Sequence, residues 1–66
     1  MIDSRDTLNL VSAIRREPNT EKRLRMLQKL NESLPENIRI QMPSLITNAY
    51  VRRALDMIEE RILLSA

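Results

Sequence analysis

The chain has 66 residues, of which 42% are hydrophobic, and a formal net charge of +2 from eleven Lys and Arg against nine Asp and Glu. It contains no Gly, Cys, His, Trp or Phe, which excludes a disulfide framework, a thiol or imidazole catalyst, the usual zinc ligands and the Gly-dependent phosphate-binding and nucleophile motifs. We therefore expect no enzymatic activity, no cofactor, no metal site and no small-molecule substrate.

The first predicted helix spans residues 3–16. Asp3 or Ser4 can cap its N-terminus, because a short polar side chain there accepts a hydrogen bond from an unpaired backbone N–H. Pro18 disfavours the α region at the residue before it and therefore ends the helix. One face of this helix is apolar, because Leu8, Val11 and Ile14 fall at helical spacing. Leu10 flanks this face.

The second predicted helix spans residues 20–33, with Asn19 or Thr20 as its capping residue. Its apolar stripe consists of Leu24, Leu27, Leu30 and Leu34. Met26 lies beside this stripe. Another face carries basic residues at i, i+3 and i+7, which we call the basic patch: Lys22, Arg25 and Lys29.

The basic patch belongs to a stretch of uneven charge. Residues 15–29 include six Lys and Arg and two Glu, a net charge of +4 that leaves −2 for the rest of the chain. A solvated helix face explains this pattern without any partner. The alternatives are contact with an acidic protein surface or direct contact with nucleic acid.

Residues 34–43 form a connector bounded by Pro35 and Pro43. Its apolar residues alternate with polar ones, as in a strand, but they also fit a helical spacing. We interpret the segment as an extended or one-turn connector that packs on the helices. The alternative is a strand that pairs with its copy in a second chain. The order of elements argues against a ribbon-helix-helix DNA-binding protein, in which the strand precedes both helices.

The last predicted helix is the longest, spans residues 44–64 and is capped by Ser44. We therefore expect a small all-α domain over residues 1–66, built from three helices with the Pro-bounded connector before the long C-terminal helix. Its predicted core consists of Leu8, Val11, Ile14, Leu24, Leu27, Leu30, Ile38, Val51, Leu55 and Ile58.

Such a core is thin, because a chain of this size rarely gains more than about 3–5 kcal/mol from its own packing and has no disulfide or metal to add. The C-terminal helix is apolar on several sides near its end, which is typical of a helix buried on more than one side. We therefore predict that it contacts another chain through Tyr50, Met57, Arg61, Ile62 and Leu64. The basic patch is the predicted secondary, electrostatic contact.

These features together indicate a binding protein. No secretory signal or membrane span is apparent, so we expect a cytoplasmic protein that does not act at a membrane. The function we expect is that of a non-enzymatic protein–protein interaction module. It would be a small accessory or regulatory subunit, alone or as a homodimer, that docks on a larger intracellular complex such as the machinery of DNA replication or transcription. Its contact with nucleic acid would then be indirect. The alternative is a homodimeric regulator that binds nucleic acid through the basic patch.

Overall fold

The computed structural model describes residues 4–65. It contains three α-helices and one short 3-10 helix: α1 (Ser4–Arg16), α2 (Thr20–Ser33), η1 (Glu36–Ile38) and α3 (Asn48–Ser65). The all-α, three-helix fold predicted from the sequence is confirmed. Within the described residues there is no strand, so residues 38–42 do not adopt the strand conformation.

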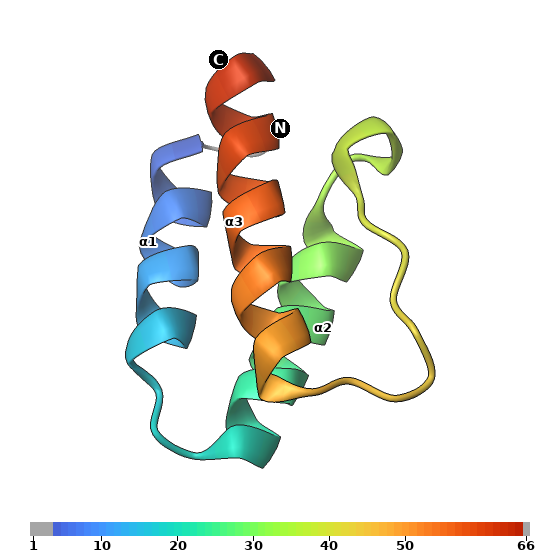
Figure 1. The fold of residues 1–66 in the computed structure, drawn as a ribbon. Helices are drawn as coiled ribbons and strands as arrows, with labels where there is room; N and C mark the ends of the chain where they lie inside the picture. Colours follow the sequence, from blue (N-terminus) through green and yellow to red (C-terminus); the bar gives the residue numbers. More distant parts are fainter. Residues whose placement is uncertain (1–3, 66) are drawn as a thin grey trace.

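A short turn joins α1 and α2 into an antiparallel hairpin (Figure 1). The Oδ1 atom of Asn19 accepts a hydrogen bond from the backbone N–H of Lys22 at 3.0 Å, so Asn19 caps α2. On the other side of the turn, the Nε atom of Arg23 donates to the carbonyl oxygen of Ile14 at 3.2 Å. These contacts satisfy backbone groups at the two helix ends and fix the turn.

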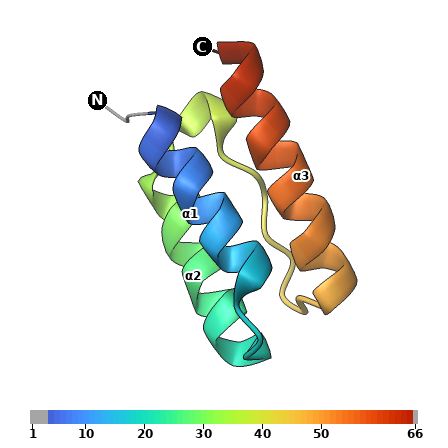
Figure 2. The same ribbon diagram turned by 90° about the vertical axis from the view of Figure 1, so that its left-hand side faces the viewer.

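The segment between α2 and α3 is long because the two helices run in the same direction. It returns along the full length of the bundle, on the side opposite α1 (Figures 1 and 2). The 14 residues of α2 rise by about 21 Å, and extended chain covers that distance with about seven residues. The segment therefore occupies the position that a further helix would have in a four-helix bundle.

A buried asparagine holds this segment against α2. Asn31 is 6% exposed. Its Nδ2 atom donates to the carbonyl oxygen of Ile40 at 2.8 Å, and its Oδ1 atom accepts from the Ile40 N–H at 2.9 Å. This pair of hydrogen bonds imitates a backbone partner and allows the apolar Ile40 side chain to enter the core.

The N-terminus of α3 lies further along the chain than predicted. The helix begins at Asn48, and the Oγ1 atom of Thr47 accepts a hydrogen bond from the backbone N–H of Tyr50 at 3.1 Å. The prediction that Ser44 caps a helix beginning there is wrong, because residues 44–47 complete the crossing segment. Thr47 supplies the capping oxygen instead.

The core lies between the three helices and the connector. Its buried residues are Val11, Ile14, Leu27, Leu30, Leu34, Ile40, Val51, Ala54, Leu55, Ile58 and Ile62. Three residues of the predicted core are only partly buried and pack against it: Leu8, Leu24 and Ile38. The connector delivers Ile40 instead of Ile38 because Asn31 binds the backbone of residue 40.

Candidate functional site

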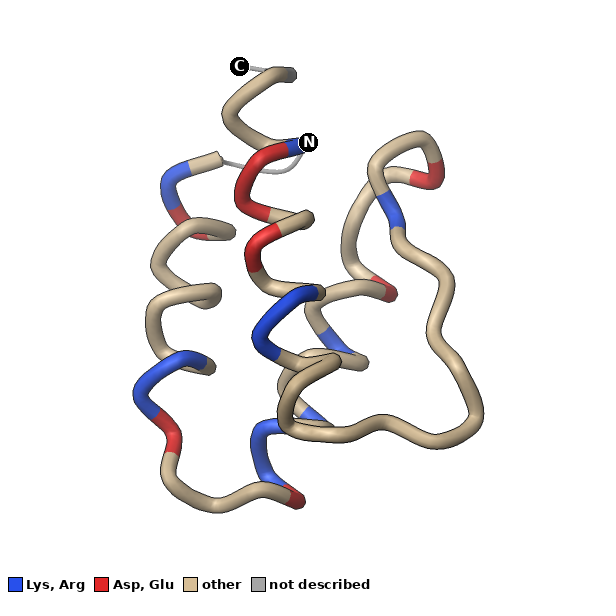
Figure 3. The backbone as a smooth tube through the Cα atoms, viewed as in Figure 1, with Lys and Arg blue, Asp and Glu red and all other residues tan. Residues whose placement is uncertain are grey.

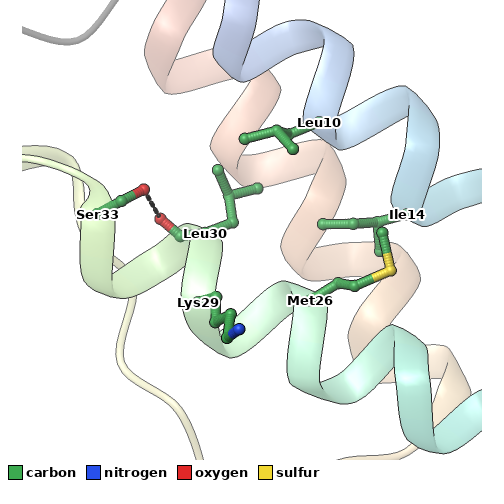
Figure 4. A pocket seen from close by; sticks show the side chains of 6 residues that line it. All are labelled: Leu10, Ile14, Met26, Lys29, Leu30 and Ser33. Carbon is green, nitrogen blue, oxygen red and sulfur yellow. Dashed lines mark hydrogen bonds between the residues drawn. The ribbon is translucent and has the colours of Figure 1, made fainter.

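A groove lies between α1 and α2 on the face turned away from α3 (Figure 4). It contains a hollow of about 320 Å³ lined by Leu10, Ile14, Met26, Lys29, Leu30 and Ser33. Ile14 and Leu30 are also core residues, 1% and 3% exposed, and Leu10 is 48% exposed. The groove therefore continues the core to the surface, and the described residues leave this side of the hairpin uncovered.

The helical spacing of the sequence explains why the groove is apolar. Leu10 lies one turn before Ile14 on α1, and Met26 lies one turn before Leu30 on α2. The Oγ atom of Ser33 donates to the carbonyl oxygen of Leu30 at 2.7 Å, so this hydroxyl is satisfied by its own helix (Figure 4). Leu10 and Met26 each lie beside the predicted apolar stripe of their helix. An apolar residue outside the stripe is the signal in the sequence for a second apolar face.

The basic patch adjoins this groove. A neighbouring hollow of about 320 Å³ is lined by Lys22, Arg25, Met26 and Lys29, so that Met26 and Lys29 belong to both hollows. All three residues of the patch are exposed. In the part of the chain that the structure describes, Lys22 lies 3.7 Å from a carboxylate oxygen of Glu17, and Arg25 and Lys29 form no ion pair. The groove thus has an apolar floor and one positively charged rim.

The polar side chains that line the groove and the adjoining hollow are Lys, Arg and Ser. None of the described residues around the two hollows is acidic. Within residues 4–65, no group of three or more acidic side chains is placed to hold a metal ion. What the groove offers a ligand is apolar contact and positive charge.

Two of the residues predicted to contact a partner bind the connector of their own chain. The hydroxyl of Tyr50 donates to the carbonyl oxygen of Gln41 at 2.7 Å. The Nη1 atom of Arg61 donates to the carbonyl oxygen of Arg39 at 3.1 Å. These contacts give both side chains a structural role in fixing the connector.

The other three predicted contact residues lie in different environments. Ile62 is 3% exposed in the core, Met57 is partly buried against the core, and Leu64 is 79% exposed. Tyr50 and Leu64 are 14 positions apart on α3, which corresponds to about 21 Å along the helix axis. The structure therefore does not bring the five residues together on one surface, and their contact with another chain stays a prediction.

Arg15 joins α1 to α3 and is withdrawn from the basic surface. Its Nη2 atom lies 2.8 Å from Asp56 Oδ1 and 3.0 Å from Glu59 Oε2. The hydrogen bond with Asp56 raises the pKa of Arg15 above its ordinary value, the bond with Glu59 acts in the same direction, and partial burial opposes both. Arg15 is thus a paired structural cation.

A second basic surface lies at one end of the molecule. Lys and Arg lie where α1 ends and where α2 and α3 begin, with Glu17 and Glu21 between them (Figure 3). The first two turns of α3 contribute Arg52 and Arg53, which are both exposed. These two residues lie outside the basic stretch identified from the sequence, and the fold brings their end of α3 to the same end of the bundle.

No protein family model matches the chain, and no curated protein or solved structure matches it. None of the helices in residues 4–65 combines the length and the apolar character needed to cross a bilayer.

Proposed function

We propose that the protein is a non-enzymatic protein–protein interaction module, a small accessory or regulatory subunit that docks on a larger partner through the α1–α2 groove. The observation that supports this is the uncovered apolar hollow beside Leu10, Met26 and Leu30. Concave, mostly apolar surfaces with a few polar groups at the edge are typical of sites where a second molecule binds. A core of this size also gains from additional buried surface.

The proposal is tested by comparing two surface variants as affinity baits. Leu10→Glu places a charge in the groove, and Leu45→Glu places the same charge between the connector and α3, where Leu45 is 79% exposed. A partner that binds the groove should be captured by the wild type and by Leu45→Glu and lost with Leu10→Glu. Circular dichroism should show that both variants keep their helix content. Equal capture by the two variants contradicts docking at the groove, and a wild-type monomer that captures nothing contradicts the function.

The basic end of the molecule supports a second candidate function, which is direct binding of nucleic acid. Clustered Lys and Arg are sufficient for contacts with phosphate groups, and such an end suits a subunit of a complex that handles DNA, as in replication or transcription. The test is fluorescence anisotropy with a labelled duplex at low salt. Arg52→Glu with Arg53→Glu should weaken binding and reduce its dependence on salt. Absence of binding at low salt excludes this candidate.

A further inference from the structure

We propose that the occupant of the α1–α2 groove is one amphipathic helix of a partner protein, with an apolar stripe on the groove floor and acidic residues facing the basic patch. This inference rests on the proposed docking function and specifies its ligand. It is carried by the apolar hollow between the antiparallel helices α1 and α2 and by the basic hollow that adjoins it on α2.

The shape of the groove suits a helix. The two helices of the α1–α2 hairpin already hold α3 against one face, and the groove is the opposite face of the same pair (Figure 4). Ridges of side chains on an added helix can enter such a groove as they do in a bundle. An extended peptide is a poorer fit, because backbone groups within α1 and α2 are already paired inside their helices and offer little to a bare strand.

The combined length of the groove and the adjoining basic hollow sets the length of the bound segment. The two hollows together follow α2 from Lys22 to Ser33. These eleven steps correspond to about 17 Å of helix axis. A bound helix of about three turns would cover both hollows, with apolar residues at i, i+3, i+4 and i+7 directed at the floor.

Charge complementarity determines the polar side of the bound helix. Lys22 and Lys29 are seven positions apart on α2, with Arg25 between them, so the patch extends over about 10 Å. Acidic residues spaced by one turn along the partner helix can face all three cations. The basic patch is exposed, so ion pairs between it and the acidic residues of the partner helix would mainly set the orientation and the association rate of the complex. The apolar floor would supply most of the affinity.

Nucleic acid and a second copy of the chain fit this groove less well. Phosphate groups can meet the basic patch, but they make no use of an apolar floor, and the groove has no aromatic side chain for base stacking. A second copy of the chain would have to present the acidic residues of its α3 to the basic patch. Two of them, Asp56 and Glu59, are already paired with Arg15 of their own chain, which partly neutralises their charge.

The experiment is a selection from a displayed library of helical 15-residue peptides. Every peptide carries Leu or Ile at the four floor positions, and the flanking positions vary among Glu, Gln and Lys. The bait is the full chain. Selection on the wild type should enrich Glu over Lys at flanking positions one turn apart. Anisotropy with the labelled best binder should show affinity about tenfold to a hundredfold above that of its Gln analogue, a difference that falls as salt rises.

Two triple variants with the same net charge test whether the basic patch is what selects acidic peptides. Lys22→Glu, Arg25→Glu and Lys29→Glu should abolish the preference for acidic peptides. The control reverses three exposed basic residues outside the groove, Arg16, Arg52 and Arg53, to Glu, and should keep the preference while the net charge changes equally. Chemical shift changes caused by the bound peptide should centre on Leu10 and Met26.

The possible failures distinguish this inference from the function on which it rests. Equal enrichment of Glu, Gln and Lys, with binding that is still lost in Leu10→Glu, overturns the acidic helix and leaves docking at the groove intact. No enrichment, together with capture of the same partners by Leu10→Glu and by the wild type, overturns both. A dimer of the wild type that Leu10→Glu dissociates assigns the groove to a second copy and also overturns the inference.

Discussion

Asn31→Ala should destabilise the protein by about 2–4 kcal/mol, because it removes both hydrogen bonds that fix the connector. The backbone N–H and carbonyl of Ile40 would each lose a partner 2.9 or 2.8 Å away in a buried setting. An unsatisfied buried polar group costs about 1–3 kcal/mol. Two such groups would cost about 2–6 kcal/mol together. We expect the lower half of this range, because water can reach residue 40 along its exposed neighbours, Arg39 and Gln41.

This loss is comparable with the whole stability of about 3–5 kcal/mol expected for a core of this size. Urea unfolding followed by circular dichroism at 222 nm measures it directly. Asn37→Ala, at an exposed position of η1, is the matched control and should change stability by less than about 0.5 kcal/mol. Trypsin should cut Asn31→Ala faster at Arg39 as the connector detaches. If Asn31→Ala has the unfolding midpoint of the control, the connector is not held by this side chain and the reasoning is wrong.

Three further substitutions test other parts of the fold. Ile62→Ala should lower the free energy of unfolding by about 2–4 kcal/mol, because Ile62 is 3% exposed. Leu64→Ala, at a residue that is 79% exposed, should lower it by less than about 0.5 kcal/mol in the same urea titration. Equal losses would contradict the packing of α3. Thr47→Ala should lower stability by about 1 kcal/mol while Ser44→Ala leaves it unchanged, and the reverse result would restore the earlier helix start. Arg15→Gln should cost up to about 1 kcal/mol at low salt and less in 1 M NaCl; a loss that does not depend on salt would argue against the ion pairs.

Local signals in the sequence predicted most of the helix boundaries. The second helix was predicted at 20–33 and is observed at Thr20–Ser33, because Asn19 and the proline after the helix act through neighbouring residues. The start of α3 could not be predicted in this way. Ser44 is in isolation at least as good a cap as Thr47. The choice of Thr47 depends on how far the chain must extend before it reaches the other end of α2.

The surface residues were harder to predict than the helices, for a similar reason. The basic patch depends only on helical spacing, and the structure shows Lys22, Arg25 and Lys29 exposed around one hollow. The apolar floor beside it needs the side-by-side placement of α1 and α2, which no local pattern contains. Tyr50 and Arg61 carry the polar and apolar character of contact residues, but their partners are backbone carbonyls, and a sequence does not display these.

The parallel course of α2 and α3 has a consequence for the order of folding. The α1–α2 hairpin joins residues that are close in the sequence and can form early. Contacts such as Arg15–Asp56 join residues 41 positions apart and must wait until the intervening chain has crossed the molecule. Substitutions in the hairpin core should therefore slow refolding, whereas those confined to α3 should mainly accelerate unfolding.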